Sequence, residues 1–160
     1  MTPQPPRVVV TRRLPEAVEA ELSARFEAVL NPDDRQMDKA ALAKAFAEAD
    51  AVLCTVGDRI DAQTVGAAPR AKMVATFSVG TNHIDLEACR AAGVRVSSTP
   101  GVLTDATADI ALSLILMTMR RCGEGERMVR AGEWRGWTPT QLLGRDPTGA
   151  TLGIVGMGRI

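Results

Sequence analysis

The chain has no net charge, only three cysteines and no apolar run long enough to cross a membrane. Its 160 residues carry 19 basic and 19 acidic side chains. A balanced charge gives no electrostatic footprint for nucleic acid or for an anionic membrane, so we expect neither as a partner. The first residues lead directly into a strand-like run with no apolar signal segment, which favours a cytoplasmic location.

The cysteines Cys54, Cys89 and Cys122 are widely spaced and odd in number. This pattern argues against a disulfide framework and against a paired-thiolate metal site. We therefore expect no metal and interpret the three thiols as small core residues.

Hydrophobic residues make up 46% of the chain, which is enough to bury a core in a protein of about one domain. Short β-branched runs alternate with alanine-rich stretches, as in βαβ units around a parallel sheet. Strands are expected at 8–11, 27–30, 51–55, 72–77 and 94–97. Helices are expected at 15–25, 38–48 and 85–92, the last two opening with Asp38 and Asp85 as N-caps. The sequence thus predicts an α/β fold with a flavodoxin-like, doubly wound parallel sheet.

Residues 98–101 read as a linker because Pro100 and Gly101 interrupt regular structure. The next segment, 105–121, is apolar around most of a helix circumference and needs partners on several faces. Its apolar run is shorter than the roughly 20 residues of a membrane span. An interdomain or intersubunit helix is the remaining interpretation, and it predicts exposed apolar surface in the isolated chain.

Residues 77–85 lie where a parallel strand ends and a helix begins. Ligands of open α/β sheets bind at this edge, and Gly80 would let a small anion approach the main chain closely. An ordinary strand-to-helix turn capped by Asn82 or Asp85 explains the same residues, and it is the simpler interpretation of this loop by itself. The loop alone leaves both interpretations open.

Gly156 and Gly158 follow the strand-like run 151–155 and match the first two glycines of a dinucleotide-binding turn, Gly-x-Gly-x-x-Gly. The third glycine would be the next residue after Ile160. Run 151–155 would be the first strand of a second sheet that has no other strand in the chain. We therefore expect it to be unpaired, mispaired or borrowed by another chain.

Four segments together closely resemble the D-isomer-specific 2-hydroxyacid dehydrogenases in their order, spacing and residue identities: 78–85, 93–96, 99–109 and 152–160. Residues 134–144 resemble more narrowly the glyoxylate and hydroxypyruvate reductases. The resemblance implies a substrate-binding (catalytic) lobe at 1–100. It also implies a hinge helix and the truncated start of a Rossmann NAD(P)-binding domain at 101–160.

By the same resemblance the protein would reduce a small 2-oxoacid, glyoxylate or hydroxypyruvate, with NAD(P)H, and with NADPH favoured. It would form a homodimer through the region 105–137. Substrate would be held by the backbone amides of Val79 and Gly80, bordered by Val56 and Gly57. The cofactor would contact Thr107, Gly156, Gly158, Arg159 and Ile160.

Two tryptophans lie in the segment that resembles the reductases. Trp137 is similar to a tryptophan that reaches the active site of a neighbouring subunit, and anchoring of its own loop is the equally weighted alternative. Trp134 is assigned to packing. Met117, Met119 and Met128 are assigned to core or interface filling.

His83 is the only histidine, and a histidine is the residue expected to donate a proton when a ketone is reduced. In the family, however, a late histidine has this role, with a glutamate and an arginine, and all three match regions beyond residue 160. The resemblance therefore implies no catalytic residue in this chain, a structural role for His83 and an inactive chain by itself.

Two function hypotheses remain. One is the amino-terminal half of such a reductase. The other is a non-enzymatic dimerisation or interaction fragment of the same superfamily, using segment 105–121. A phosphoryl-receiver domain is excluded because the first strand ends in Thr11-Arg12-Arg13 where that fold needs an acidic pair.

Overall fold

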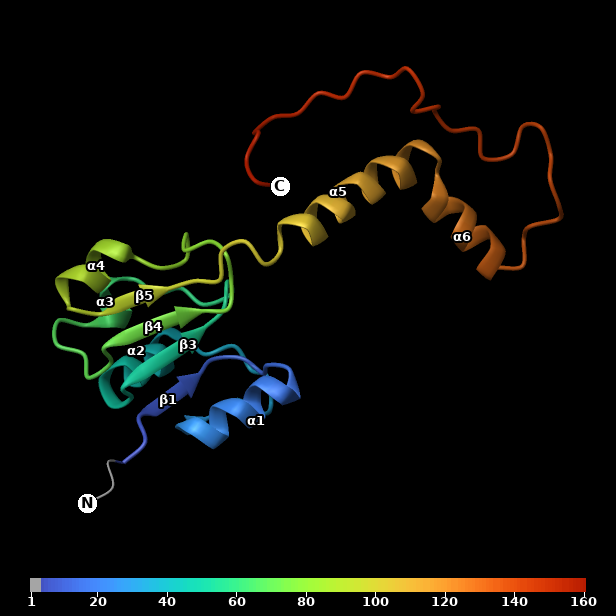
Figure 1. The fold of residues 1–160 in the computed structure, drawn as a ribbon. Helices are drawn as coiled ribbons and strands as arrows, with labels where there is room; N and C mark the ends of the chain where they lie inside the picture. Colours follow the sequence, from blue (N-terminus) through green and yellow to red (C-terminus); the bar gives the residue numbers. More distant parts are fainter. Residues whose placement is uncertain (1–3) are drawn as a thin grey trace. The chain divides into compact units, whose positions relative to one another are not determined.

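The computed structural model describes residues 4–160, and the chain divides into two compact units, Met1–Gly101 and Val102–Ile160 (Figure 1). The division falls at the end of the segment where Pro100 and Gly101 were expected to interrupt regular structure. Each unit is described by itself below.

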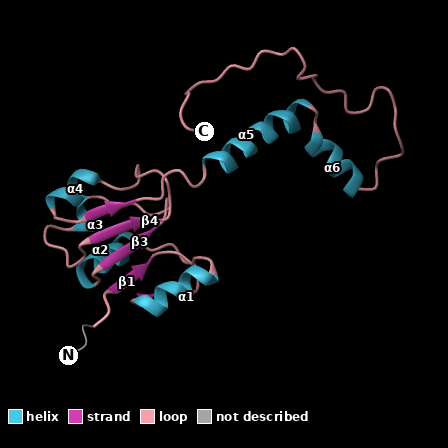
Figure 2. Ribbon diagram, viewed as in Figure 1, coloured by secondary structure: helices cyan, strands magenta, loops and turns pink. Residues whose placement is uncertain are grey.

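The first unit is built on one five-stranded parallel sheet with the order β2-β1-β3-β4-β5 (Figure 2). Every strand expected in this unit is present, and each end lies within one residue of its predicted position. The fold prediction is therefore confirmed as an α/β architecture with a parallel sheet. The strands are β1 (Arg7–Val10), β2 (Glu27–Val29), β3 (Ala51–Cys54), β4 (Met73–Thr76) and β5 (Arg95–Ser97).

The helices of the first unit are α1 (Glu16–Arg25), α2 (Lys39–Glu48), α3 (Ala62–Val65) and α4 (Leu86–Ala91). Both expected caps form, since Asp38 accepts from Ala41 N at 2.8 Å and Asp85 from Ala88 N at 2.9 Å. This settles the cap of the 77–85 loop in favour of Asp85. Helix α3 was not predicted, because four residues are too few to show a helical period.

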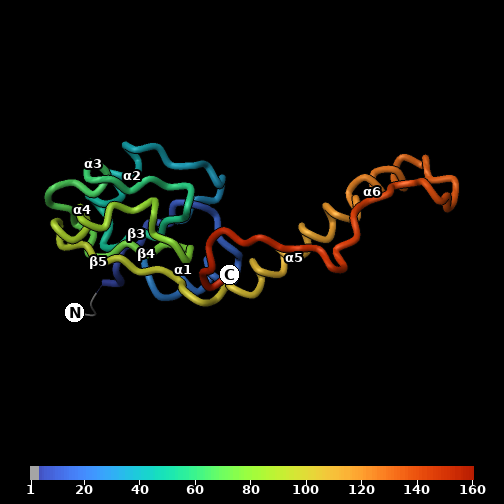
Figure 3. Tube along the Cα trace, turned by 90° about the horizontal axis from the view of Figure 1, so that it is seen from above, coloured from blue at the N-terminus to red at the C-terminus, as the bar shows by residue number. Residues whose placement is uncertain are grey.

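The main core lies on the face of the sheet covered by α2, α3 and α4. Because the strand order reverses at β1, right-handed crossovers place α1 on the opposite face, as Figure 3 shows. The core residues alternate along β3 and β4, and α2 contributes the largest of them, Phe46, which is 1% exposed. By contrast, α1 contains no buried residue. The sheet is thus packed firmly on one side and lightly on the other.

The second unit contains α5 (Thr104–Met119) and α6 (Cys122–Arg130). The helix expected over 105–121 ends at Met119, because Arg121 adopts a left-handed conformation with a φ of 55°. No signal in the sequence marks a helix end at Met119, since neither glycine nor proline occurs at residues 119–121. Much of the apolar surface of α5 is exposed, as expected for a helix whose partners lie elsewhere, including Ile110, Leu112, Leu114, Leu116 and Met117.

The strand expected at 151–155 does not form, and Val155 is fully exposed. This outcome is the unpaired one of the alternatives considered, because the described second unit offers no neighbouring strand to bond with. Two packing predictions are wrong for the same lack of partner surface. Trp134 is 55% exposed, and Cys122 is exposed although Cys54 and Cys89 are buried. Met117 is 46% exposed, so of its two predicted roles only interface filling remains a prediction.

Within residues 4–160, no helix is both long and apolar enough to cross a membrane. The same residues contain no group of three or more histidine, cysteine, aspartate or glutamate side chains that is arranged to hold a metal ion.

Candidate functional site

Two loops leave the carboxyl edge of the sheet side by side. Strands β3 and β4 pair in parallel with Cys54 opposite Thr76. The β3–β4 ladder continues past the strand ends, because Phe77 N donates to Cys54 O at 2.8 Å. The β1–β3 ladder also continues, because Thr11 N donates to Leu53 O at 3.0 Å. The loop after β3 and the loop after β4 are therefore neighbours at the edge where α/β proteins bind their ligands.

The loop after β4 exposes free main chain at Val79 and Gly80. Val79 is 42% exposed, and a Cβ placed on Gly80 would meet no atom within 4 Å. Among the described residues, neither amide N–H donates a hydrogen bond. Adjacent, unpartnered amides on an open backbone are the groups that bind a small anion such as a carboxylate.

The rest of this loop is tied down closely. Thr99 N donates to Ser78 O at 2.9 Å, and the Ser78 hydroxyl donates to Gly80 O at 2.7 Å. Ile84 forms an isolated parallel bridge with Ile60, and Ile60 N donates to His83 O at 2.9 Å. The open amides therefore belong to a loop fixed at both ends.

His83 lies inside this hydrogen-bonded structure. Its Nε2 is 2.9 Å from the Thr76 hydroxyl. Burial lowers the pKa of the His83 imidazole, and the nearby Asp58 carboxylate offsets part of that shift. A ring that is neutral near pH 7 and bonded to the protein suits the structural role that the sequence suggested better than that of a proton donor to substrate.

Asp58 anchors the loop after β3 and was missed by the sequence analysis. Its side chain is 1% exposed, and Oδ2 accepts from the Thr11 hydroxyl, from Thr55 N at 2.8 Å and from the Thr55 hydroxyl at 3.3 Å. It thus joins the ends of β1 and β3. Sequence gives no signal for this, because Thr11 and Asp58 are 47 positions apart.

The two residues after Thr55 are presented at the same edge. Val56 is 68% exposed, and Gly57 O accepts from the Gln36 amide. The Arg12 guanidinium approaches Gly57, since its Nη1 would lie 3.7 Å from a Cβ added there. The structure therefore brings Val56 and Gly57 to the edge that also carries Val79 and Gly80.

Arg12 is held by Asp34, with Nε to Oδ1 at 2.7 Å and Nη2 to Oδ2 at 2.9 Å. Hydrogen bonding to Arg12, with a further bond from Arg13 N, lowers the pKa of Asp34 to about 2. The positive charge of Arg12 is therefore largely compensated before any ligand is present.

The thiol of Cys54 is not a nucleophile in this structure. It is fully buried at the end of β3, and burial raises its pKa to about 11. A neutral, enclosed thiol acts as a small core residue, as the sequence predicted for it.

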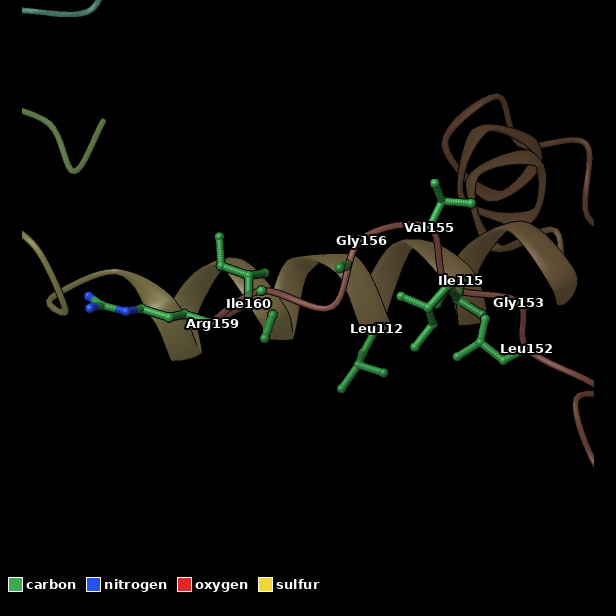
Figure 4. A pocket seen from close by; sticks show the side chains of 12 residues that line it. Leu112, Ile115, Leu152, Gly153, Val155, Gly156, Arg159 and Ile160 are labelled. Atoms are coloured by element: carbon green, nitrogen blue, oxygen red, sulfur yellow. The ribbon is translucent and has the colours of Figure 1, made fainter. Parts of the chain in front are cut away.

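The residues expected at a cofactor lie in the second unit. Residues 152–156 and 158–160, which include Gly156, Gly158, Arg159 and Ile160, line an apolar groove of about 740 Å³ together with α5 (Figure 4). Figure 4 shows Leu112 and Ile115 of α5 on the groove wall. Thr107 is not part of that wall, and its hydroxyl donates to Leu103 O at 2.7 Å.

Trp137 also lies in the second unit, and its side chain is 81% exposed. Of the two roles considered, anchoring its own loop is therefore not seen within this chain. A fully presented indole ring is available to another surface.

The sequence of residues 8–155 matches the description "D-isomer specific 2-hydroxyacid dehydrogenase, catalytic domain". The chain belongs to this family. Its relatives include the glyoxylate reductase of Thermococcus kodakarensis, which is 42% identical over 159 residues, covering 97% of this chain and 48% of that protein. The resemblance inferred from the motifs is thus confirmed.

Solved structures agree with this family assignment. The TT0316 protein of Thermus thermophilus superimposes with a TM-score of 0.85 at 46% identity, covering 96% of this chain and 49% of that one. An NADPH-dependent glyoxylate/hydroxypyruvate reductase of Sinorhizobium meliloti, solved in complex with NADP and malonate, gives 0.78 at 30% identity, covering 98% and 47%. The chain spans about half the length of the relatives it matches.

Proposed function

We propose that the chain is the amino-terminal part of an NAD(P)H-dependent oxidoreductase that reduces glyoxylate or hydroxypyruvate to the 2-hydroxyacid. The observation that carries this proposal is the pair of unpartnered backbone amides at Val79 and Gly80, at the carboxyl edge of the sheet. Two amides suit one carboxylate, the group that every 2-oxoacid presents. Relatives named glyoxylate reductase support the choice of substrate.

The first unit would be the substrate-binding lobe. Val79 and Gly80 would hold the carboxylate and orient the acid, and Val56 and Gly57 would border it from the neighbouring loop. The exposed Val56 side chain would help to exclude water from the bound acid.

The second unit would be the hinge helix and the beginning of the cofactor domain. A pyrophosphate fits the open main chain there, because a Cβ at Gly156 or Gly158 would meet no atom within 4 Å and Gly156 has a positive φ of 92°. Arg159 and Ile160 would complete that turn, and Thr107 would contact the cofactor from α5. When bound, NAD(P)H supplies the hydride, and NADPH is favoured because a similar reductase contains NADP.

No residue of this chain is assigned to proton transfer, since His83 is committed to Thr76. We therefore expect the 160-residue chain alone to bind a 2-oxoacid weakly and not to reduce it. Its own contribution to the reaction would be to bind and orient the carboxylate.

The test is a titration of the 160-residue chain, labelled with ¹⁵N, with oxalate as an unreactive 2-oxoacid analogue. The amide signals of Val79 and Gly80 should shift most, followed by those of Val56 and Gly57. Acetamide has no carboxylate and should move none of them. If oxalate shifts no signal at this edge, the proposed substrate site is wrong.

A second candidate function is supported by the exposed apolar side chains of α5. Here two copies of the chain would associate through the region 105–137, and the exposed Trp137 ring would reach the partner. Light scattering should show a dimer that is weakened by Leu112→Ala and Leu116→Ala. A dimer that ignores both substitutions would not be using this helix, and a dimer without oxalate binding would favour an interaction fragment over a reductase.

A further inference from the structure

We propose that His83, Thr76 and Ser78 form a one-way chain of hydrogen bonds that positions the anion-binding backbone of Val79 and Gly80. The inference rests on the proposed function for its ligand, and on the geometry of the loop for its mechanism. None of the three side chains touches substrate, so they are positioning residues.

The direction of this chain follows from counting hydrogens. Gly80 O is a carbonyl and can only accept, so the single hydroxyl hydrogen of Ser78 is used on it, at 2.7 Å. Ser78 Oγ must then accept from Thr76 Oγ1, 2.8 Å away. Thr76 has thereby used its only hydrogen, so it must accept from His83 Nε2 at 2.9 Å. The structure assigns His83 the tautomer that is protonated on Nε2.

Because the hydroxyls are buried, the hydrogen bonds must run in this direction, from His83 to Gly80 O. Thr76 and Ser78 are 2% and 7% exposed, so water does not easily replace a missing partner. A buried hydroxyl left without its bond loses its solvation and gains nothing in return. If His83 carried its proton on Nδ1 instead, both Nε2 and Thr76 Oγ1 would be acceptors facing each other.

The hydrogen bonds fix two peptide planes, one on each side of the Val79–Gly80 peptide. Thr99 N holds Ser78 O, and because the peptide is trans, the N–H of Val79 points away from Thr99. Ser78 Oγ holds Gly80 O and so fixes the plane that follows. The Val79–Gly80 peptide lies between these two fixed planes.

Gly80 needs this restraint. Glycine has the widest choice of backbone conformations, and a free glycine would lose much entropy when it closes on an anion. With the bond to Ser78 already made, the two amides are prearranged before the ligand arrives. His83 contributes by ordering the hydroxyls behind them.

The first measurement needs no ligand. Long-range ¹H–¹⁵N spectra of the 160-residue chain should show His83 protonated on Nε2 at pH 8, with that hydrogen exchanging slowly. A ring protonated mainly on Nδ1 would overturn the proposal, whatever the chain binds.

The second measurement is the oxalate affinity of variants, followed at the amide signals of Val79 and Gly80. His83→Leu removes one hydrogen bond and should weaken binding about fivefold, which is the size expected for one neutral bond. Thr76→Val and Ser78→Ala each remove two bonds of the chain and should weaken binding at least as much. Thr76→Val combined with Ser78→Ala should be little worse than either alone, because both break the same chain. His83→Gln keeps an N–H donor at similar reach and should restore most of the affinity.

Thr64→Val is the matched control. Thr64 is 1% exposed, and its hydroxyl bonds to Asp61 and Arg59 O, away from the anion-binding loop. It should cost stability without changing affinity for oxalate. Equal losses of oxalate affinity in Thr64→Val and Thr76→Val, or no rescue by His83→Gln, would show that His83, Thr76 and Ser78 act only through ordinary packing.

The outcomes separate this inference from the proposed function. If wild type does not bind oxalate but His83 has its proton on Nε2, and Ser78→Ala broadens the signals of Val79 and Gly80, the positioning stands and the reductase assignment fails. If wild type binds and Ser78→Ala, Thr76→Val and His83→Leu bind equally well, the positioning fails and the reductase assignment stands.

Discussion

The two units of this chain are both rich in apolar residues, yet only the first one buries them. In residues 1–101, Val52, Val74 and Phe46 are essentially inaccessible to solvent. In residues 102–160, Leu112 and Ile154 are more than half exposed. Composition therefore does not decide whether a segment forms a core; it decides only what a core would be made from.

The difference is one of available partners. In the first unit the sheet and helices α2 to α4 supply apolar surface to one another. In the second, α5 and α6 contain no buried residue, and segment 151–155 has no strand beside it. Because a helix or a single strand cannot bury an apolar face alone, the second unit presents surface that requires another segment or another chain.

Amide hydrogen exchange should show the largest contrast between the units. Amides within β3 and β4 are bonded in the centre of the sheet and should open only on global unfolding, with protection on the order of a thousandfold or more. Amides of residues 152–155 should exchange at nearly the rate of an unfolded peptide. Strong protection there in a monomer would mean that this segment has found a partner within the chain.

Two matched side-chain substitutions test the same contrast through the free energy of unfolding. Phe46→Ala, in the core, should lower the free energy of unfolding by about 3 to 5 kcal/mol, because it leaves a cavity that the sheet cannot fill. Leu114→Ala, on exposed α5, should change it by less than about 0.5 kcal/mol. Urea unfolding of dilute protein, followed by circular dichroism, measures both. Comparable losses would show that α5 is packed in solution.

The buried polar anchor of the first unit should have the next largest effect. Asp58→Ala removes the oxygen that accepts from Thr11 and Thr55 and should cost about 1 to 3 kcal/mol, the penalty for unsatisfied buried groups. Asp33→Ala is the control, since its side chain is 72% exposed and 3.9 Å from Arg35. An Asp58→Ala protein as stable as Asp33→Ala would show that water enters this site.

Much of the first unit could be predicted because its signals are local. Each strand is a short run that contains at least one valine, and Asp38 and Asp85 stand just before helices that they do cap. Helix α3 gave no such signal. The break at Arg121 gave none either, because a left-handed arginine is imposed by the turn and not announced by glycine or proline.

The candidate site divides in the same way. Gly80 could be singled out because its position after a strand and the open backbone of glycine are written in the sequence, and Val79 was added by the family resemblance. The bond from Thr11 to Asp58 joins distant residues and depends on how β1 and β3 pair. The His83 to Ser78 chain lies within one loop, but its direction depends on which carbonyl each hydroxyl reaches. These features required coordinates.

Acid should have the smallest effect, and it should again distinguish the units. The pKa of Asp34 is lowered from 3.8 to about 2 by Arg12. A carboxyl whose pKa is depressed by folding stabilises the protein fully above its unfolded pKa, and this contribution is lost as the pH falls from about 4 to 2. The pair links the end of β1 to a loop 22 residues away, so the loss should appear in the unfolding of the first unit.

Asp34→Asn should therefore flatten part of the pH dependence of stability between about pH 4 and 2. A residual slope should remain from Asp61, whose pKa Lys39 also lowers to about 2.

In the second unit, Arg121 lowers the pKa of Glu124 from three residues away in sequence. Glu124→Gln should leave the acid unfolding of the first unit unchanged, because this pair joins no distant parts of the chain. The contributions of Asp34 and Asp61 to this pH dependence should both shrink in about 1 M salt, since the carboxylates are exposed and screened. If Glu124→Gln shifted that transition as much as Asp34→Asn does, the two units would be unfolding as one.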